Sequence, residues 1–128
     1  TYVTTTPDFR AEVEADAAAR GEARPGYVVV PEANRWQKIR MARLLLAIAS
    51  VVLRERPDVV ISTGAAPGYF ALRLGRLLGA RCIWIDSIAN ADELSWCGRR
   101  IGGHADVWLT QWEDLADENG PRYWGAVL

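Results

Sequence analysis

The sequence has little of what several protein classes require. Its two cysteines, Cys82 and Cys97, have no CxxC spacing and no nearby cluster of histidine or acidic residues, which argues against a disulfide framework and a metal site. Both are expected to be reduced thiols in or near the core. The formal net charge is −1 at pH 7, so the overall charge does not attract a nucleic acid. We therefore expect no metal ion, no cofactor and no nucleic-acid partner.

Long apolar runs and targeting segments are also missing. The longest largely apolar run, residues 44–53, is about half of the roughly 20 residues that a membrane-spanning helix needs. No stretch has the basic, apolar and small-residue parts of a signal peptide. The expectation is a cytoplasmic protein that does not cross the bilayer. Any membrane contact would be peripheral, on the cytoplasmic face.

What the chain does have is a regular alternation of strand and helix patterns. Its 128 residues suffice for one core, and no repeat, low-complexity tract or linker divides them, so residues 1–128 are expected to form a single domain. Strands are predicted at residues 2–5, 27–30, 58–61, 82–85, 107–110 and 123–127. Helices are predicted at about 7–20, 35–54, 67–78 and 90–102, with a short one after Thr110.

The segments between these strands are long enough to return the chain parallel to the strand before it. This favours an α/β fold with a Rossmann-like, doubly wound parallel sheet. The opening strand, TYVTTT, is polar, whereas doubly wound domains usually begin with a buried strand and a tight loop. It would more naturally be second in the sheet, so a first βα unit is expected to be missing from residues 1–128.

The most informative motif is TGAAPG, residues 63–68, between a predicted strand and a predicted helix. Ligands of open α/β sheets bind outside the carboxyl ends of the strands. Only Ala65 and Ala66 stand before Pro67, so the first N–H groups of the helix lack a side-chain cap and can bind a phosphate or diphosphate. Gly64 and Gly68 would let the ligand approach the backbone. The alternative is that they only form a tight turn.

A second polar loop, DSIAN, follows the strand 82–85. Its polar residues, Asp86, Ser87 and Asn90, would share a crevice with the glycine loop. Because a carboxylate repels a diphosphate, Asp86 suits sugar hydroxyls better. The alternative is that Asn90 caps the next helix, with Glu93 at capping-box spacing, while Asp86 or Ser87 satisfies backbone donors nearby.

The helix predicted at 35–54 combines a wide apolar arc with basic residues near its ends. That arc exceeds what one sheet face usually covers. It could contact anionic lipid, helped by Trp36, or another subunit; the alternative is a core helix with a solvated charged stripe. His104 is expected at a helix end and no motif places a nucleophile, so no catalytic residue is named.

Residues 56–112, together with the closing YWGAVL, resemble the oligosaccharide biosynthesis family named for asparagine-linked glycosylation protein fourteen. Bacterial members of that family include exopolysaccharide glycosyltransferase subunits. The likeness covers about residues 27–128 and follows the order TGAAPG loop, LGRLLGA helix, ID-S-N loop, HAD strand, QW and Tyr-x-Gly strand. The chain is similar, more distantly, to the amino-terminal acceptor domain of the peptidoglycan N-acetylglucosaminyltransferase.

The resemblance implies one half of a split GT-B glycosyltransferase. This half binds a polyprenyl-diphosphate-linked sugar acceptor, docks at the membrane and recruits a catalytic subunit that carries most of the UDP-sugar site. The implied donor is UDP-N-acetylglucosamine or a related UDP-sugar, used in polysaccharide or lipid-linked oligosaccharide biosynthesis. The substrate-binding residues expected in the two loops are Thr63, Gly64, Ala65, Pro67, Gly68, Asp86, Ser87 and Asn90.

The family's first strand, its glycine-rich loop and, in many eukaryotic members, a membrane anchor have no counterpart in residues 1–128. No general base is therefore assigned, and the chain is not expected to be active alone. Two other functions stay open. One is a stand-alone nucleotide-binding Rossmann domain, although TGAAPG is not the dinucleotide motif GxGxxG. The other is a non-enzymatic scaffold for a partner subunit.

Overall fold

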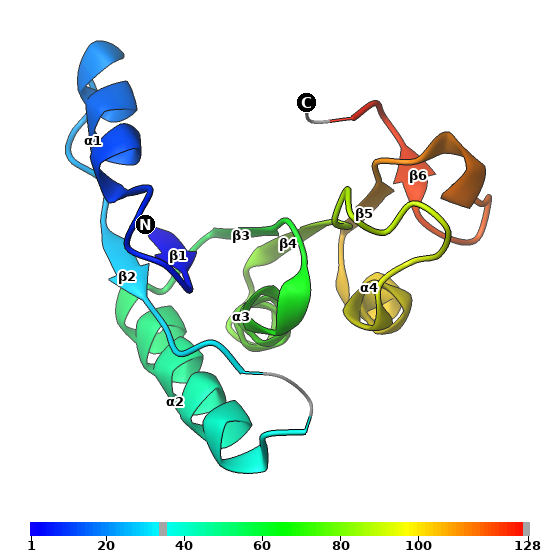
Figure 1. Cartoon of the computed structure of the whole chain (residues 1–128), viewed down its shortest axis with the longest axis horizontal. Helices are drawn as coiled ribbons and strands as arrows, with labels where there is room; N and C mark the ends of the chain where they lie inside the picture. Colours follow the sequence, from blue (N-terminus) through cyan, green and yellow to red (C-terminus); the bar gives the residue numbers. More distant parts are fainter. Residues whose placement is uncertain (34–35, 127–128) are drawn as a thin grey trace. The chain divides into compact units, whose positions relative to one another are not determined.

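The computed structural model describes residues 1–33 and 36–126, in which helices and strands alternate (Figure 1). The strands are β1 (Tyr2–Thr4), β2 (Tyr27–Val29), β3 (Val59–Ser62), β4 (Arg81–Ile85), β5 (Val107–Thr110) and β6 (Arg122–Tyr123). The helices are α1 (Arg10–Ala19), α2 (Lys38–Glu55), α3 (Ala65–Leu77) and α4 (Trp96–Ile101), with 3-10 turns η1 (Gly102–His104) and η2 (Glu113–Leu115). The chain divides into two compact units, Thr1–Ala47 and Ile48–Leu128. A single-domain organisation stays a prediction.

The first unit contains a two-stranded parallel sheet, β1 and β2, with α1 between them in the chain. Tyr27 on β2 anchors the start of α1. Its hydroxyl donates a 2.9 Å hydrogen bond to the carbonyl oxygen of Thr6, and the Arg10 guanidinium lies 5.0 Å from its ring centroid. The strand–helix–strand order predicted for this part of the sequence is confirmed.

The second unit contains a four-stranded sheet in the order β3-β4-β5-β6, in which every neighbouring pair is parallel. The chain is thus an α/β protein with a parallel sheet flanked by helices, consistent with a Rossmann-like fold. Because the strands are parallel, β3, β4 and β5 all end at the same edge of the sheet. That carboxyl edge carries the loops that the sequence singled out.

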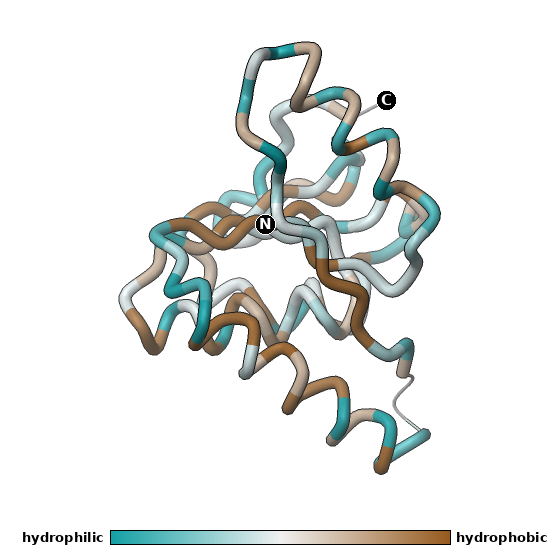
Figure 2. The backbone as a smooth tube through the Cα atoms, turned by 90° about the vertical axis from the view of Figure 1, so that its left-hand side faces the viewer, coloured by the Kyte–Doolittle hydropathy of each residue, from teal (hydrophilic) through white to brown (hydrophobic). Residues whose placement is uncertain are grey.

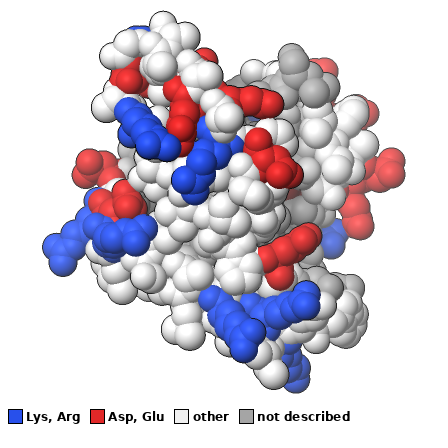
Figure 3. Space-filling model, turned by 60° about the vertical axis from the view of Figure 1, so that its left-hand side comes forward, with Lys and Arg blue, Asp and Glu red and all other residues white. Residues whose placement is uncertain are grey.

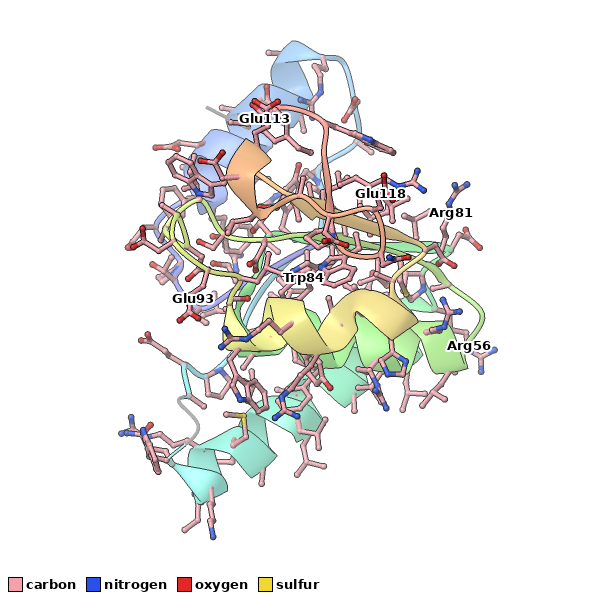
Figure 4. The ribbon with its side chains drawn as sticks, turned by 90° about the vertical axis from the view of Figure 1, so that its right-hand side faces the viewer. Arg56, Arg81, Trp84, Glu93, Glu113 and Glu118 are labelled. Atoms are coloured by element: carbon pink, nitrogen blue, oxygen red, sulfur yellow. The ribbon has the colours of Figure 1, made fainter. Side chains whose placement is uncertain are left out.

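Helices α3 and α4 pack on one face of this sheet through small residues. A Cβ added to Gly75 of α3 would lie 2.7 Å from Val60, and one added to Gly102, just after α4, would lie 2.4 Å from the Trp108 ring. The core on this face consists of Leu72, Cys82, Trp84 and Ile101. Figure 4 shows Trp84 between the sheet and the two helices.

Three predicted helix starts are wrong. Helix α1 begins at Arg10, with Phe9 as its N-cap, instead of near residue 7. Helix α3 begins at Ala65, two residues before Pro67, and has Gly64 as its N-cap. Helix α4 begins after Ser95, whose side chain accepts a 2.8 Å hydrogen bond from the N–H of Gly98. The capping box predicted for Asn90 is therefore not formed. The predicted cap and start of the long helix, residues 34 and 35, lie outside the described residues.

The predicted helix after Thr110 is also wrong, since only the 3-10 turn η2 forms there. The Thr110 hydroxyl oxygen accepts a 3.2 Å hydrogen bond from the N–H of Trp112, two residues later, which closes a turn instead of capping a helix. The strand predicted at 123–127 is the short β6.

Helix α2 has 18 residues and is apolar on two sides. Leu44 and Ile48 are buried, whereas Ile39, Leu46 and Leu53 are 73%, 70% and 60% exposed. Figure 2 shows apolar and polar residues alternating along this helix. The wide apolar arc predicted from the sequence is therefore only partly buried. Among the described residues, no helix is both long and apolar enough to span a membrane.

Candidate functional site

The glycine loop and the polar loop adjoin at the carboxyl edge of the four-stranded sheet. Strands β3 and β4 pair in parallel and end at Ser62 and Ile85. A Cβ added to Gly64 would lie 3.5 Å from the Cβ and 3.6 Å from the backbone nitrogen of Ser87. The structure therefore brings together two loops that are more than 20 residues apart in the chain, as the parallel arrangement predicts.

The start of α3 has no side-chain cap. Its N-cap, Gly64, has φ 122° and ψ −169°, a combination that only glycine adopts readily. The first N–H groups of a helix have no partner within it. The backbone N–H groups of Ala65 and Ala66 are therefore free of intrahelical bonds at the N-terminus of α3. Pro67, the third helical residue, has no N–H to satisfy. A 13-residue helix with an uncapped start can bind an anion there.

The side chain of Ser62, the last residue of β3, fixes the glycine loop by two hydrogen bonds. Its buried hydroxyl accepts a 3.1 Å hydrogen bond from the N–H of Gly64 and donates a 3.2 Å bond to the Gly64 carbonyl. A Cβ on Gly68 would lie 1.7 Å from the Ser62 Oγ. The packing of α3 on β3 is thus sufficient to require glycine at position 68. Sequence reasoning missed Ser62; the signal was a polar residue at the end of an apolar strand.

Ala65 has φ 61°, in the left-handed region that residues with a Cβ rarely occupy. Such strain costs about 1–3 kcal/mol and persists only where the surrounding structure enforces it, often at ligand sites. Here the neighbouring Gly64 is held by both hydrogen bonds to Ser62. The exposed Ala65 and Thr63 lie on either side of it at the surface.

Asp86, the first residue of the polar loop, is 1% exposed and its carboxylate is fully engaged. It accepts hydrogen bonds from the Ser95 N–H at 2.7 Å and the Ser95 hydroxyl at 2.5 Å. It also accepts a 3.3 Å bond from the Trp84 indole N–H. These contacts favour the alternative in which Asp86 serves nearby donors and holds the start of α4. A contact between Asp86 and a sugar stays a prediction.

The remaining loop residues form a compact turn. The Ser87 hydroxyl oxygen accepts a 3.3 Å hydrogen bond from the Ala89 N–H, and the Ser87 carbonyl accepts a 3.0 Å bond from the Asn90 N–H. The half-buried Asn90 side chain makes no hydrogen bond within the described part of the chain. Its amide group and the Thr63 hydroxyl are therefore available to a ligand at this edge.

Gln111 and Trp112, which directly follow β5, connect the polar loop to the end of that strand by hydrogen bonds. The buried Gln111 donates a 2.8 Å hydrogen bond from Nε2 to the Asp86 carbonyl, and Trp112 donates a 2.9 Å bond from its indole to the Ile88 carbonyl. Sequence reasoning noted the pair QW without giving it a role. Both side chains position the loop and come from the third strand end along the same edge.

The buried carboxylate of Asp86 also affects the ionisation of a nearby thiol. Burial raises the pKa of the Cys97 thiol, and the negative charge of Asp86 raises it further. Cys97 therefore stays protonated at neutral pH, which does not suit a nucleophile. In the described residues no group of three His, Cys, Asp or Glu side chains could hold a metal ion. A hollow of about 250 Å³ lined by η1, β5 and β6 residues includes none of the candidate site residues.

No family model, curated protein or solved structure matches this chain. The fold and the site define an α/β unit whose parallel sheet carries two adjoining loops and an uncapped helix start at its carboxyl edge. Membership of the oligosaccharide biosynthesis family rests on the motifs of the sequence and is a proposal.

Proposed function

We propose that this chain is the acceptor-binding, membrane-docking part of a heteromeric GT-B glycosyltransferase. A separate catalytic subunit supplies most of the UDP-sugar site. N-acetylglucosamine or a related sugar passes from the UDP-sugar to a polyprenyl-diphosphate-linked acceptor, in polysaccharide or lipid-linked oligosaccharide biosynthesis. The observation that supports this proposal is the uncapped start of α3 beside the polar loop, where a Cβ added to Gly64 would lie 3.5 Å from the Ser87 Cβ.

In this proposal the acceptor diphosphate binds at the start of α3. The N–H groups of Ala65 and Ala66 donate to its oxygens, and the positive end of the helix dipole lowers the energy of the bound anion. The small Gly64 keeps the backbone accessible, while Ser62 holds its conformation. The Asn90 amide and the Thr63 hydroxyl face the attached sugar. No residue of this chain is assigned as the general base.

Membrane docking is assigned to the exposed side of α2. Ile39, Leu46 and Leu53 follow one another at intervals of seven residues, so they lie on one side of the helix. Trp36, which precedes the helix, is 78% exposed. Figure 3 shows Lys and Arg side chains beside a largely uncharged surface, and α2 itself carries Lys38, Arg40 and Arg43 in its first half. Apolar and basic residues combined in this way suit the surface of an anionic membrane.

The acceptor site is tested with farnesyl diphosphate, a short lipid diphosphate, added to the full-length protein. We expect saturable shifts in the amide NMR signals of Ala65 and Ala66. The variant Ala65→Asp should raise the dissociation constant at least about tenfold, because its carboxylate would lie within about 6 Å of the bound diphosphate. The matched control, Ala65→Asn, has the same shape without the charge and should keep binding close to that of the unmodified protein.

Several results would contradict the proposal. If farnesyl diphosphate shifts neither amide, or binds Ala65→Asp and Ala65→Asn equally well, the start of α3 is not the diphosphate site. Tight binding of NAD would favour the stand-alone nucleotide-binding domain. Full transferase activity of the Ala65→Asp protein with its partner would indicate a scaffold that takes no part in acceptor binding.

A further inference from the structure

The hollow of about 250 Å³ beside β5 lies where that strand begins. Strand β6 pairs with Leu109 and Thr110 of β5, whereas within the described residues Val107 and Trp108 pair only with β4. The short β6 therefore leaves space next to the first two residues of β5. All the lining residues lie within the range 102–124, in the second of the two units, and none of them belongs to the glycine loop or the polar loop.

Two charged side chains, Asp106 and Arg122, line this hollow, and only the cation is free to bind a ligand. The Asp106 carboxylate accepts hydrogen bonds from the Cys82 N–H at 2.7 Å and from Arg76 at 3.1 Å, so both of its oxygens are engaged. The Arg122 guanidinium makes no hydrogen bond or ion pair within residues 1–33 and 36–126. A guanidinium presents five N–H donors in a planar fork that matches a carboxylate. The hollow therefore favours an anion.

Two indole rings, those of Trp108 and Trp124, line the same hollow. Aromatic rings pack well on indoles, in offset-stacked or edge-to-face arrangements. The indole N–H of Trp108 is buried and has no acceptor in the described part of the chain. Buried polar groups nearly always have a partner, so an acceptor brought by a bound molecule would be favourable beside this ring. The surroundings thus suit a ligand that combines an aromatic ring with anionic oxygens.

We propose that this hollow binds a small aromatic carboxylate. The carboxylate forms two parallel hydrogen bonds with the Arg122 guanidinium, and the ring packs against the Trp124 indole. The Trp108 ring turns so that its N–H also donates to a carboxylate oxygen. A volume of about 250 Å³ suits a single ring, because pockets for drug-sized ligands begin at roughly 300 Å³. This inference does not rest on the proposed function, since the two sites share no residue.

The probe is benzoate, titrated into the full-length protein and followed by the assigned indole N–H signals in NMR spectra. We expect saturable shifts of the Trp108 and Trp124 signals, with a dissociation constant of about 1 mM. Benzamide has the same ring without the charge, and acetate has the charge without the ring. Each should bind at least about tenfold more weakly than benzoate. These comparisons use the unmodified protein, so they do not depend on the folding of a variant.

A variant then tests the role of the free cation. Arg122→Gln should raise the dissociation constant for benzoate at least about tenfold, because it removes the charged fork. The matched control is Arg99→Gln on α4, which removes the charge of an exposed arginine outside the hollow and should leave binding unchanged. Shifts that do not saturate, equal binding of benzoate and benzamide, or unchanged affinity of Arg122→Gln would refute the site. Tighter binding of phenyl phosphate than of benzoate would mean that the hollow takes a phosphate ester, which also overturns the proposal.

Discussion

At the scale of single residues, the shape of the glycine loop has two separate causes. Gly64 has φ 122°, so its dihedral angle excludes other residues. Gly68 is required by a contact, since its Cβ would overlap the Ser62 hydroxyl. Ala65, between them, occupies the left-handed region despite its Cβ. The loop therefore depends on backbone conformation and on the close approach of α3 to β3.

The contact at Gly68 leads to a prediction about stability. Gly68→Ala should reduce the free energy of unfolding by about 1–3 kcal/mol, because the new Cβ forces Ser62 and α3 apart. The matched control is Gly103→Ala in η1, where a Cβ would meet nothing within 4 Å and the change should stay within about 0.5 kcal/mol. Urea unfolding measures both values. Equal stability of Gly68→Ala and the unmodified protein would show that the close contact is not enforced in solution.

The sequence predicted the neighbourhood of the site but not all of its contacts. That Gly64 adjoins Ser87 follows from the parallel strands that precede them, and alternation alone predicts such strands. The capping of α4 by Ser95 does not follow from local spacing. It depends on Asp86, nine residues earlier, whose buried carboxylate binds Ser95. A capping box at Asn90 was equally plausible from the sequence because cap patterns are short.

At the scale of elements, α2 shows where helix patterns stop being informative. Its apolar residues predict a helix correctly, since their spacing matches the helical repeat. The same spacing does not say which of two apolar sides is buried. The structure shows that Leu44 and Ile48 are buried and that Leu46 is exposed. That distinction depends on contacts made elsewhere in the chain.

The exposed side of α2 leads to a second prediction. Leu46→Glu should lower the fraction of protein that floats with phosphatidylglycerol-containing vesicles at least about tenfold, since it removes apolar contact and adds a repelled charge. Leu77→Glu on α3 is the control, because it adds the same charge at a leucine that is 82% exposed, against 70% for Leu46. Its flotation should match that of the unmodified protein. Flotation that is equal with anionic and neutral vesicles, or that both variants lose equally, would remove the membrane assignment.

At the scale of the whole molecule, the pH dependence of stability involves Asp106, which directly precedes β5 and bonds to residues of α3 and β4. Its carboxylate accepts a 2.7 Å hydrogen bond from the Cys82 N–H and a 3.1 Å bond from Arg76. The Cys82 N–H and then the Arg76 guanidinium lower the pKa of Asp106. A carboxyl group with a lowered folded pKa stabilises the protein above its unfolded pKa, about 3.9. This stability is lost as the pH falls through the folded value.

Asp106→Asn should therefore lower the urea midpoint at pH 7 more than at pH about 3, where the native carboxyl is increasingly protonated. Urea titrations of both proteins at the two pH values measure the difference. Arg122→Gln on β6 is the control, because in the described part of the chain the ion pair of Asp106 is with Arg76 and not with Arg122. A midpoint difference that does not depend on pH would show that the Asp106 charge contributes nothing to folding.

The order of strands and helices in the whole chain could be predicted, since apolar runs, glycines and prolines mark their positions. The division of the strands between two sheets could not be predicted. The sequences of Tyr2–Thr4 and Val59–Ser62 do not indicate which strand each of them pairs with. Pairing depends on contacts between distant segments. The length of β6 also depends on such contacts, so the sequence predicts a strand at 123–127 where the structure has Arg122–Tyr123.

The hydrogen bonds that Ser62 makes to Gly64 hold a bend whose outward donors belong to the peptide backbone. Among substitutions, only proline removes such a donor; other side chains can hide it only by adding a competing charge or bulk. Two proteins could therefore keep the same arrangement of backbone donors in this loop although few of their residues are identical. Homologues of such proteins are therefore better recognised by the backbone dihedral angles of this loop and by the Ser62–Gly64 hydrogen bonds than by sequence identity.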